Sequence, residues 1–60
     1  MENRIKICNR IFATNNDNEG LFVWNGNNWH QLVGTCDFNV KNVKDKFGKI
    51  RRYVKNRYSY

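Results

Sequence analysis

The chain has 60 residues, of which 40% are hydrophobic and 15% aromatic, and its formal net charge is +6. This length holds a single domain, residues 1–60, with a thin core, and the composition is too apolar for a disordered chain. No hydrophobic run approaches the roughly 18–20 residues that a membrane-spanning helix needs, so no membrane partner is expected. The first ten residues lack the apolar core of a signal peptide. We therefore expect a cytoplasmic protein, and its small size and basic charge suit a phage-infected bacterial host.

The charge is unevenly distributed along the chain. Residues 1–40 carry three basic and four acidic side chains, whereas residues 41–60 carry eight basic and one acidic. A dense positive field in one segment is typical of proteins that bind nucleic acid or an acidic protein surface. The asymmetry therefore predicts an anionic partner, and solubility of a small protein is the alternative explanation.

The first predicted element is a strand at residues 4–14, where apolar and polar side chains alternate. A period of two indicates a strand that is buried on one face. One parity holds Ile5, Ile7 and Ile11, and the other holds Arg4, Lys6, Arg10 and Phe12. Asn9 interrupts the apolar parity and is interpreted as a bulge or kink. Residues 15–20, with the sequence NNDNEG, predict a turn.

Residues 21–24 and 28–34 are predicted to pair as a hairpin around Asn25-Gly26. This dipeptide is favoured in hairpin turns because both residues accept a positive φ. A two-residue loop would pair Phe22 with Trp29, and a four-residue loop would change the partners without changing the faces. One face then carries Phe22, Trp24, Trp29 and Val33, and the other carries Leu21, Val23, His30 and Leu32.

The last predicted element is a helix at residues 40–58, since apolar residues recur there at steps of three or four. These residues are Val40, Val43, Phe47, Ile50, Val54 and Tyr58. Asp37 or Asn39 is expected to cap the helix. Gly48 costs about 1 kcal/mol relative to Ala inside a helix. The alternative is a turn at residues 45–48, which makes the fold an all-β meander or small barrel of four to five strands.

The predicted fold class is α+β, with a three-stranded antiparallel sheet followed by a basic amphipathic helix. The helix is expected to cover the sheet face that holds Ile5, Ile7, Ile11, Leu21, Val23 and Leu32. The open face then displays Arg4, Lys6, Arg10, Phe12, Phe22, Trp24 and Trp29. Basic side chains beside aromatic ones suit the stacking of single-stranded bases. The alternative buries the Trp pair in the core and leaves the aliphatic face outside or against a second subunit, as a homodimer.

No catalytic or metal-binding constellation is recognised in the chain. Cys8 and Cys36 are expected to be free, buried thiols. Together with His30 they lack the fourth ligand and the spacing of a zinc site. We therefore expect a protein that is not an enzyme and that holds neither metal nor cofactor.

Two functions fit these features. The first is non-catalytic binding of nucleic acid, single-stranded or non-specific, with phosphates on the basic segment and bases stacked on sheet aromatics. The second is a small phage-type inhibitor or modulator that binds an acidic surface of a host enzyme, including a groove that normally holds nucleic acid. In both, the candidate binding residues are Lys41, Lys44, Arg51, Arg52, Lys55, Trp24, Trp29, Arg4, Lys6 and Arg10.

Overall fold

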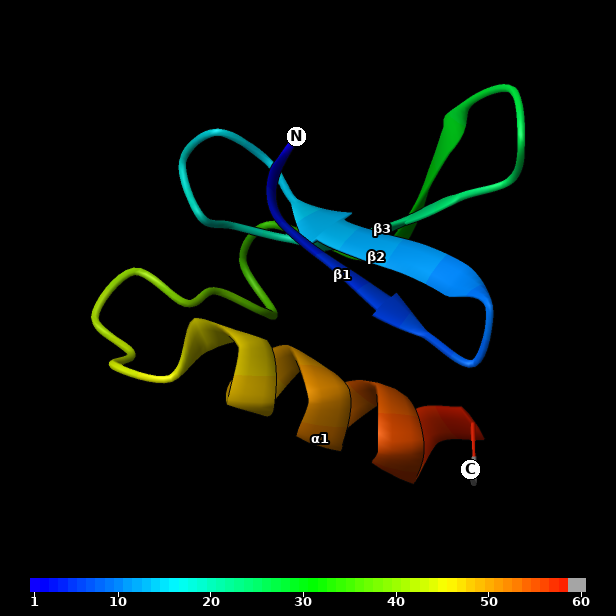
Figure 1. The fold of residues 1–60 in the computed structure, drawn as a ribbon. Helices are drawn as coiled ribbons and strands as arrows, with labels where there is room; N and C mark the ends of the chain where they lie inside the picture. Colours follow the sequence, from blue (N-terminus) through cyan, green and yellow to red (C-terminus); the bar gives the residue numbers. More distant parts are fainter. Residues whose placement is uncertain (59–60) are drawn as a thin grey trace.

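The structure is a computed structural model that describes residues 1–58 as a sheet and a helix. The elements are β1 (Glu2–Ile7), β2 (Arg10–Thr14), β3 (Leu21–Trp24), β4 (Trp29–Val33) and α1 (Lys46–Tyr58). The strands form one antiparallel sheet in the order β1-β2-β3-β4, and α1 lies across one of its faces (Figure 1). The α+β class is therefore confirmed. The sheet has four strands rather than the predicted three, and four is the number that the all-β alternative allowed.

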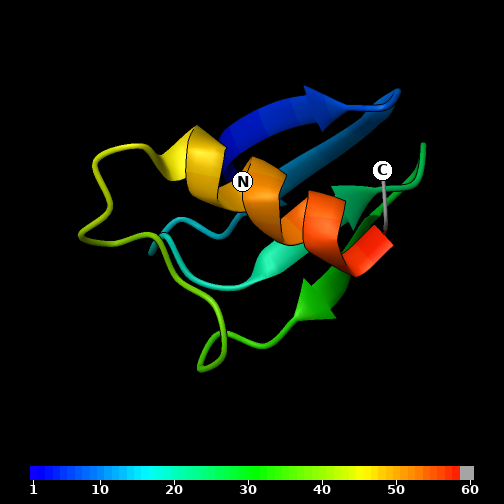
Figure 2. The same ribbon diagram turned by 90° about the horizontal axis from the view of Figure 1, so that it is seen from below.

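Figure 2 shows the same two layers from below, with α1 in front of the sheet and the long connection from β4 to α1 at one side. Within the described residues, no helix is long and apolar enough to span a membrane.

A tight turn divides the predicted first strand into β1 and β2. Ile7 pairs with Arg10 across a two-residue turn made by Cys8 and Asn9. These two residues have φ of 49° and 67°, as a type I′ hairpin turn requires. The prediction of one strand at residues 4–14, with a bulge or kink at Asn9, is therefore wrong. Apolar and polar side chains alternate on both sides of the turn, so the sequence pattern does not reveal the turn.

The turn also changes which residues of β2 face the core. Residues paired across a hairpin share a face, and Phe12 pairs with Ile5. Phe12 is accordingly 1% exposed in the core, while Ile11 is 37% exposed on the opposite face. The predicted places of these two residues are therefore wrong. The rest of the predicted core face is confirmed, namely Ile5, Ile7, Leu21, Val23 and Leu32.

β3 and β4 are joined by the longer of the two predicted loops, since Trp24 pairs with Trp29. The Asn25 Oδ1 accepts hydrogen bonds from the backbone N–H groups of Asn27 and Asn28, at 2.8 and 2.7 Å. Gly26 has a φ of 101°. The Asn25 side chain therefore closes the loop, and Asn28 belongs to the loop rather than to the strand.

α1 begins at Lys46 rather than at residue 40. The Val40 N–H donates to the Asn18 carbonyl at 2.9 Å, and the Gly20 N–H donates to the Phe38 carbonyl at 2.7 Å. These bonds hold residues 38–40 against the loop at residues 15–20 and keep them out of the helix. The cap is Asp45, whose Oδ1 accepts a bond from the Gly48 N–H at 2.9 Å, so the prediction of Asp37 or Asn39 is wrong.

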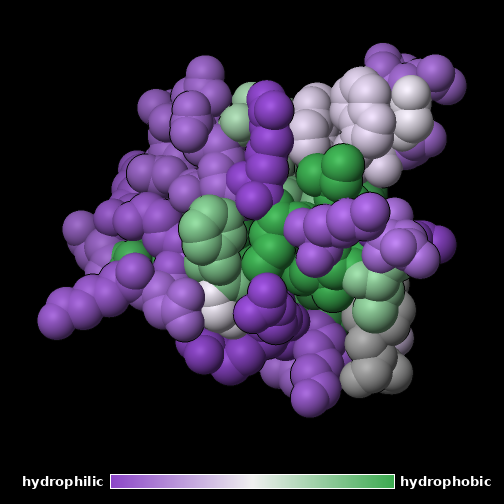
Figure 3. All heavy atoms as spheres, in the orientation of Figure 1, coloured by the Kyte–Doolittle hydropathy of each residue, from purple (hydrophilic) through white to green (hydrophobic). Residues whose placement is uncertain are grey.

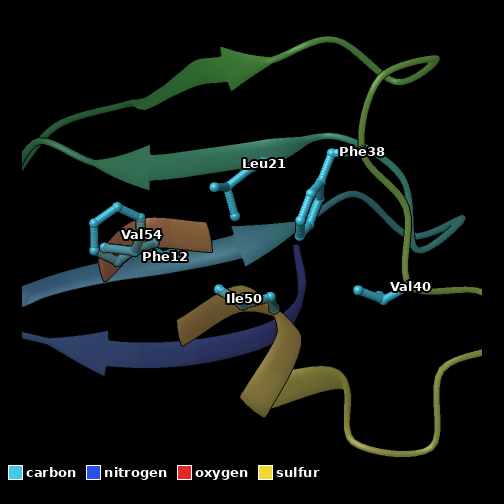
Figure 4. Packing of buried hydrophobic residues seen from close by; sticks show 6 residues of the cluster. All are labelled: Phe12, Leu21, Phe38, Val40, Ile50 and Val54. Atoms are coloured by element: carbon cyan, nitrogen blue, oxygen red, sulfur yellow. The ribbon is translucent and has the colours of Figure 1, made fainter. Parts of the chain in front are cut away.

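The core lies between the sheet and α1 (Figure 4). Its buried side chains are Phe12, Leu21, Phe38, Val40, Ile50 and Val54. Phe47, which belonged to the predicted apolar face, is instead 46% exposed. Tyr53 packs on the core in its place, with its ring centroid 5.1 Å from that of Phe38.

Candidate functional site

The predicted binding residues separate into two surfaces on opposite sides of the sheet. α1 covers one face of the sheet (Figure 1). Its cations Arg51, Arg52 and Lys55 are exposed, whereas Ile50 and Val54 are buried in the core. We call Arg51, Arg52 and Lys55 the helix surface. The register places another set on the uncovered face, which we call the open sheet face: Arg4, Lys6, Ile11, Trp24 and Trp29.

The helix surface belongs to a helix that has six basic residues and no acidic ones. In residues 1–58 no carboxylate pairs with any of these six, because the one salt bridge found there joins Lys41 to Glu19. Hydrophilic residues cover most of the molecule around α1, in the lower part of Figure 3. The positive field of α1 is therefore not neutralised within the part of the chain that is described.

Lys41 and Lys44 precede α1. The predicted helix at residues 40–58 would have placed them on one helical face with the helix surface, but in the structure they are outside the helix. The Lys41 Nζ lies 2.9 Å from the Glu19 Oε2, and this hydrogen bond raises the pKa of Lys41. Lys44 is exposed in the connection that leads to α1. Lys41 is thus already paired with a carboxylate, whereas Lys44 is exposed.

A hollow of about 500 Å³ adjoins the helix surface, between α1 and the segment at residues 36–39. α1 contributes Lys49, Arg52 and Tyr53 to its walls. Lys49 and Tyr53 were not among the predicted site residues. The signal that could have found them is helical spacing, three residues from Lys49 to Arg52 and four from Lys49 to Tyr53. The facing segment, however, comes from a separate part of the chain.

The open sheet face contains a smaller hollow of about 260 Å³, lined by Arg4, Ile11, Trp24 and Trp29. The two Trp rings pack edge to face, with centroids 5.3 Å apart and planes at 61°. Trp24 is 38% exposed, so the alternative that buried the Trp pair in the core is wrong.

Arg10 lies near this surface although it does not share its parity. It pairs with Ile7 beside the β1–β2 turn and is exposed. Together with Trp24 it lines a hollow of about 550 Å³ between the tips of the two hairpins. Arg10 and Trp24 are thus brought together, while the predicted neighbour Phe12 is in the core.

The thiols are free and exposed rather than buried, at Cys8 in a turn and at Cys36 in the wall of the hollow between α1 and residues 36–39. His30 is exposed on β4. Among the described residues, no group of three or more His, Cys, Asp or Glu side chains is placed to hold a metal ion.

Comparisons of the chain with models of known protein families, with curated proteins and with solved structures found no match. A function for the chain is therefore inferred from its own surfaces.

Proposed function

We propose that the protein binds nucleic acid without catalysing a reaction, and that the helix surface contacts the phosphate backbone. The observation that supports this function is the charge of α1, with six basic residues, no acidic residue and no carboxylate partner among residues 1–58. Cations that neutralise phosphates release the counterions condensed on the nucleic acid, and this release drives sequence-independent binding. We place this binding in the cytoplasm, including that of a phage-infected bacterium.

The charge of α1 has a cost for the isolated protein. Arg51 and Lys55 are like charges at i and i+4, an arrangement that destabilises a helix by about 0.2–0.5 kcal/mol. Lys46 and Lys49 lie near the N-terminus, where the helix dipole disfavours cations. A polyanion bound along α1 would offset both destabilising effects. Charges that served solubility alone would not need to occupy these destabilising positions.

The proposal is tested by titrating single-stranded and duplex oligonucleotides at several salt concentrations. The logarithm of the affinity should fall linearly with the logarithm of salt, by about 0.7 per phosphate contact for single strands. A variant with Arg51, Arg52 and Lys55 all changed to Gln should reduce this slope by about 2, the sum of three such contacts.

The control is Arg4→Gln combined with Lys6→Gln, which removes positive charge from the open sheet face and should change the slope much less. Undetectable binding near ~150 mM salt, down to the ~10⁻⁴ M that is typical of non-specific contacts, would overturn the proposal.

A second candidate function is favoured by the open sheet face. Trp24 and Ile11 are exposed there beside Arg4, and Trp and Arg are enriched among residues that anchor protein–protein interfaces. In that function the protein is a modulator that docks on a host enzyme through the sheet. A single stoichiometric partner should then survive nuclease treatment, be lost with Trp24→Ala and persist in the helix-surface variant. Loss of that partner in the helix-surface variant alone would contradict docking through the sheet.

A further inference from the structure

The hollow between α1 and residues 36–39 is formed before any ligand arrives. The segment is held in place because the Phe38 carbonyl accepts a bond from the Gly20 N–H at 2.7 Å and the Phe38 ring is 5% exposed. In Figure 4 this ring points from its loop toward the helix. The volume of about 500 Å³ lies within the range of roughly 300–1,000 Å³ that is typical of ligand pockets.

One wall of the hollow is aromatic. The half-buried ring of Tyr53 packs against Phe38, with planes inclined at 60°. Phe38 belongs to the core, so it restricts the movement of the Tyr53 ring. An immobilised ring at the edge of an open hollow is a platform on which a planar group can stack.

The hollow also contains both signs of charge. The Lys49 Nζ donates to the Asn39 carbonyl at 2.8 Å and lies 5.5 Å from the centroid of the Phe38 ring, so its position is fixed. Arg52 is exposed on the α1 side, and Asp37 is exposed on the loop side. An anionic group would therefore approach Arg52 and Lys49, while a hydrogen-bond donor would suit the carboxylate of Asp37.

We propose that this hollow takes one unpaired nucleotide of a single-stranded nucleic acid. The base stacks on Tyr53, its phosphate contacts Arg52 and Lys49, and Asp37 accepts a hydrogen bond from an amino group of the base or a hydroxyl of the sugar. This inference rests on the proposed function, because the hollow continues the helix surface at Arg52. A base in a duplex is stacked and paired and would have to be flipped out before it could enter. The hollow therefore predicts a preference for single strands over duplexes.

The first test compares two neighbouring arginines on α1. Arg52→Ala and Arg51→Ala remove the same exposed side chain and the same charge, but Arg52 alone lines the hollow. The two variants should weaken duplex binding equally. Arg52→Ala should weaken single-strand binding several-fold more than Arg51→Ala does.

The second test concerns Tyr53. Tyr53→Leu should lower the affinity for single strands by about 5- to 150-fold, the range typical for the loss of one stacked base. Tyr53→Phe keeps the ring and should leave the affinity unchanged. Tyr53 also packs on Phe38, so Tyr53→Leu disturbs the core as well as the hollow. A second measurement therefore uses the unmodified protein, which is irradiated with a bromouracil-containing single strand. The cross-link should map to Tyr53 or its neighbours in the hollow.

The outcomes separate this inference from the proposed function. Equal effects of the two arginine variants on single strands, together with cross-links outside the hollow, would overturn the inference and leave nucleic-acid binding intact. Absence of binding to any oligonucleotide would overturn both.

Discussion

At the turn between β1 and β2, Cys8 occupies a backbone conformation that suits its side chain poorly. Its φ is 49°, and an L-residue in the left-handed region costs roughly 1–2 kcal/mol unless it is Gly, or Asn or Asp with local hydrogen bonds. Asn9, the next residue, is of the tolerated kind and has a φ of 67°. The turn is therefore specified by Asn9 and by strand pairing, against the preference of Cys8.

Replacing Cys8 should consequently stabilise the protein. We expect Cys8→Asn to raise the free energy of unfolding by about 0.5–1 kcal/mol, since it relieves part of the left-handed cost. Urea denaturation measures the change. Cys36→Asn is the matched control at an exposed cysteine with no positive φ, and it should give no comparable gain. A destabilised Cys8→Asn variant would contradict the strained turn.

Gly20 and Gly26 both have positive φ but differ in their surroundings. A Cβ at Gly20 would lie 3.1 Å from the Phe22 Cε1 and 3.3 Å from the Val33 carbonyl oxygen, whereas a Cβ at Gly26 would have no atom within 4 Å. Gly20→Ala should add a crowding cost of about 1–3 kcal/mol to the cost of its positive φ, whereas Gly26→Ala carries a backbone cost alone. Thermal unfolding should thus show a larger loss for Gly20→Ala than for Gly26→Ala, and equal losses would contradict the crowding around Gly20.

At the scale of elements, the start of α1 depends on one side chain. Asp45 accepts the hydrogen bond of the Gly48 N–H and also supplies a negative charge to the positive end of the helix dipole. A Cβ on Gly48 would overlap the Asp45 Oδ2 in its present position. Gly48 therefore leaves room for the cap, at the expense of helix propensity.

This arrangement predicts coupling between the two residues. In the Asp45→Ala background, Gly48→Ala should stabilise the protein by up to about 1 kcal/mol, the full difference in helix propensity. In the wild type the same substitution must displace the carboxylate, so the gain should be smaller by at least about 0.5 kcal/mol. A double-mutant cycle in urea measures this coupling. Identical effects in the two backgrounds would show that Asp45 caps the helix without regard to Gly48.

At the scale of the whole molecule, two thin layers leave both outer sides accessible. α1 lies on one side of the sheet (Figure 1) and exposes the helix surface, while the open sheet face belongs to the other side. One short, straight oligonucleotide cannot contact Arg52 and Trp24 together, because the core lies between them. The sequence predicted one binding site that combined basic residues of the C-terminal segment with the sheet aromatics. In the structure these residues form two separate surfaces.

Trp24→Ala should accordingly leave the affinity for a short oligonucleotide almost unchanged. Combined with Arg52→Ala, it should add no more than about twofold to the loss caused by Arg52→Ala alone, within the usual additivity of distant sites. Fluorescence anisotropy with a labelled single strand measures both. A strong loss caused by Trp24→Ala would show that the strand wraps around the sheet and contacts both surfaces.

The sequence alone determined the features that depend on local patterns. The helical period through Ile50 and Val54 does not depend on the rest of the chain, and neither does the lack of acids in α1. The turn tendency of Asn25-Gly26 is likewise local. The α+β class and the positive surface of α1 could therefore be predicted, because spacing along a helix decides which side chains share a face.

The tertiary structure decided what depends on contacts between distant segments. Bonds from residues 38–40 to the loop at residues 15–20 keep those residues out of α1, and the helical spacing of the apolar residues does not reveal these bonds. Pairing across the Cys8-Asn9 turn placed Phe12 in the core, since residues paired across a tight hairpin share a face and Phe12 pairs with Ile5. The same contacts put Phe38 beside Tyr53 and set the two binding surfaces on opposite sides of the sheet. Pairing and packing between segments far apart in the chain are therefore what arranged the candidate sites in space.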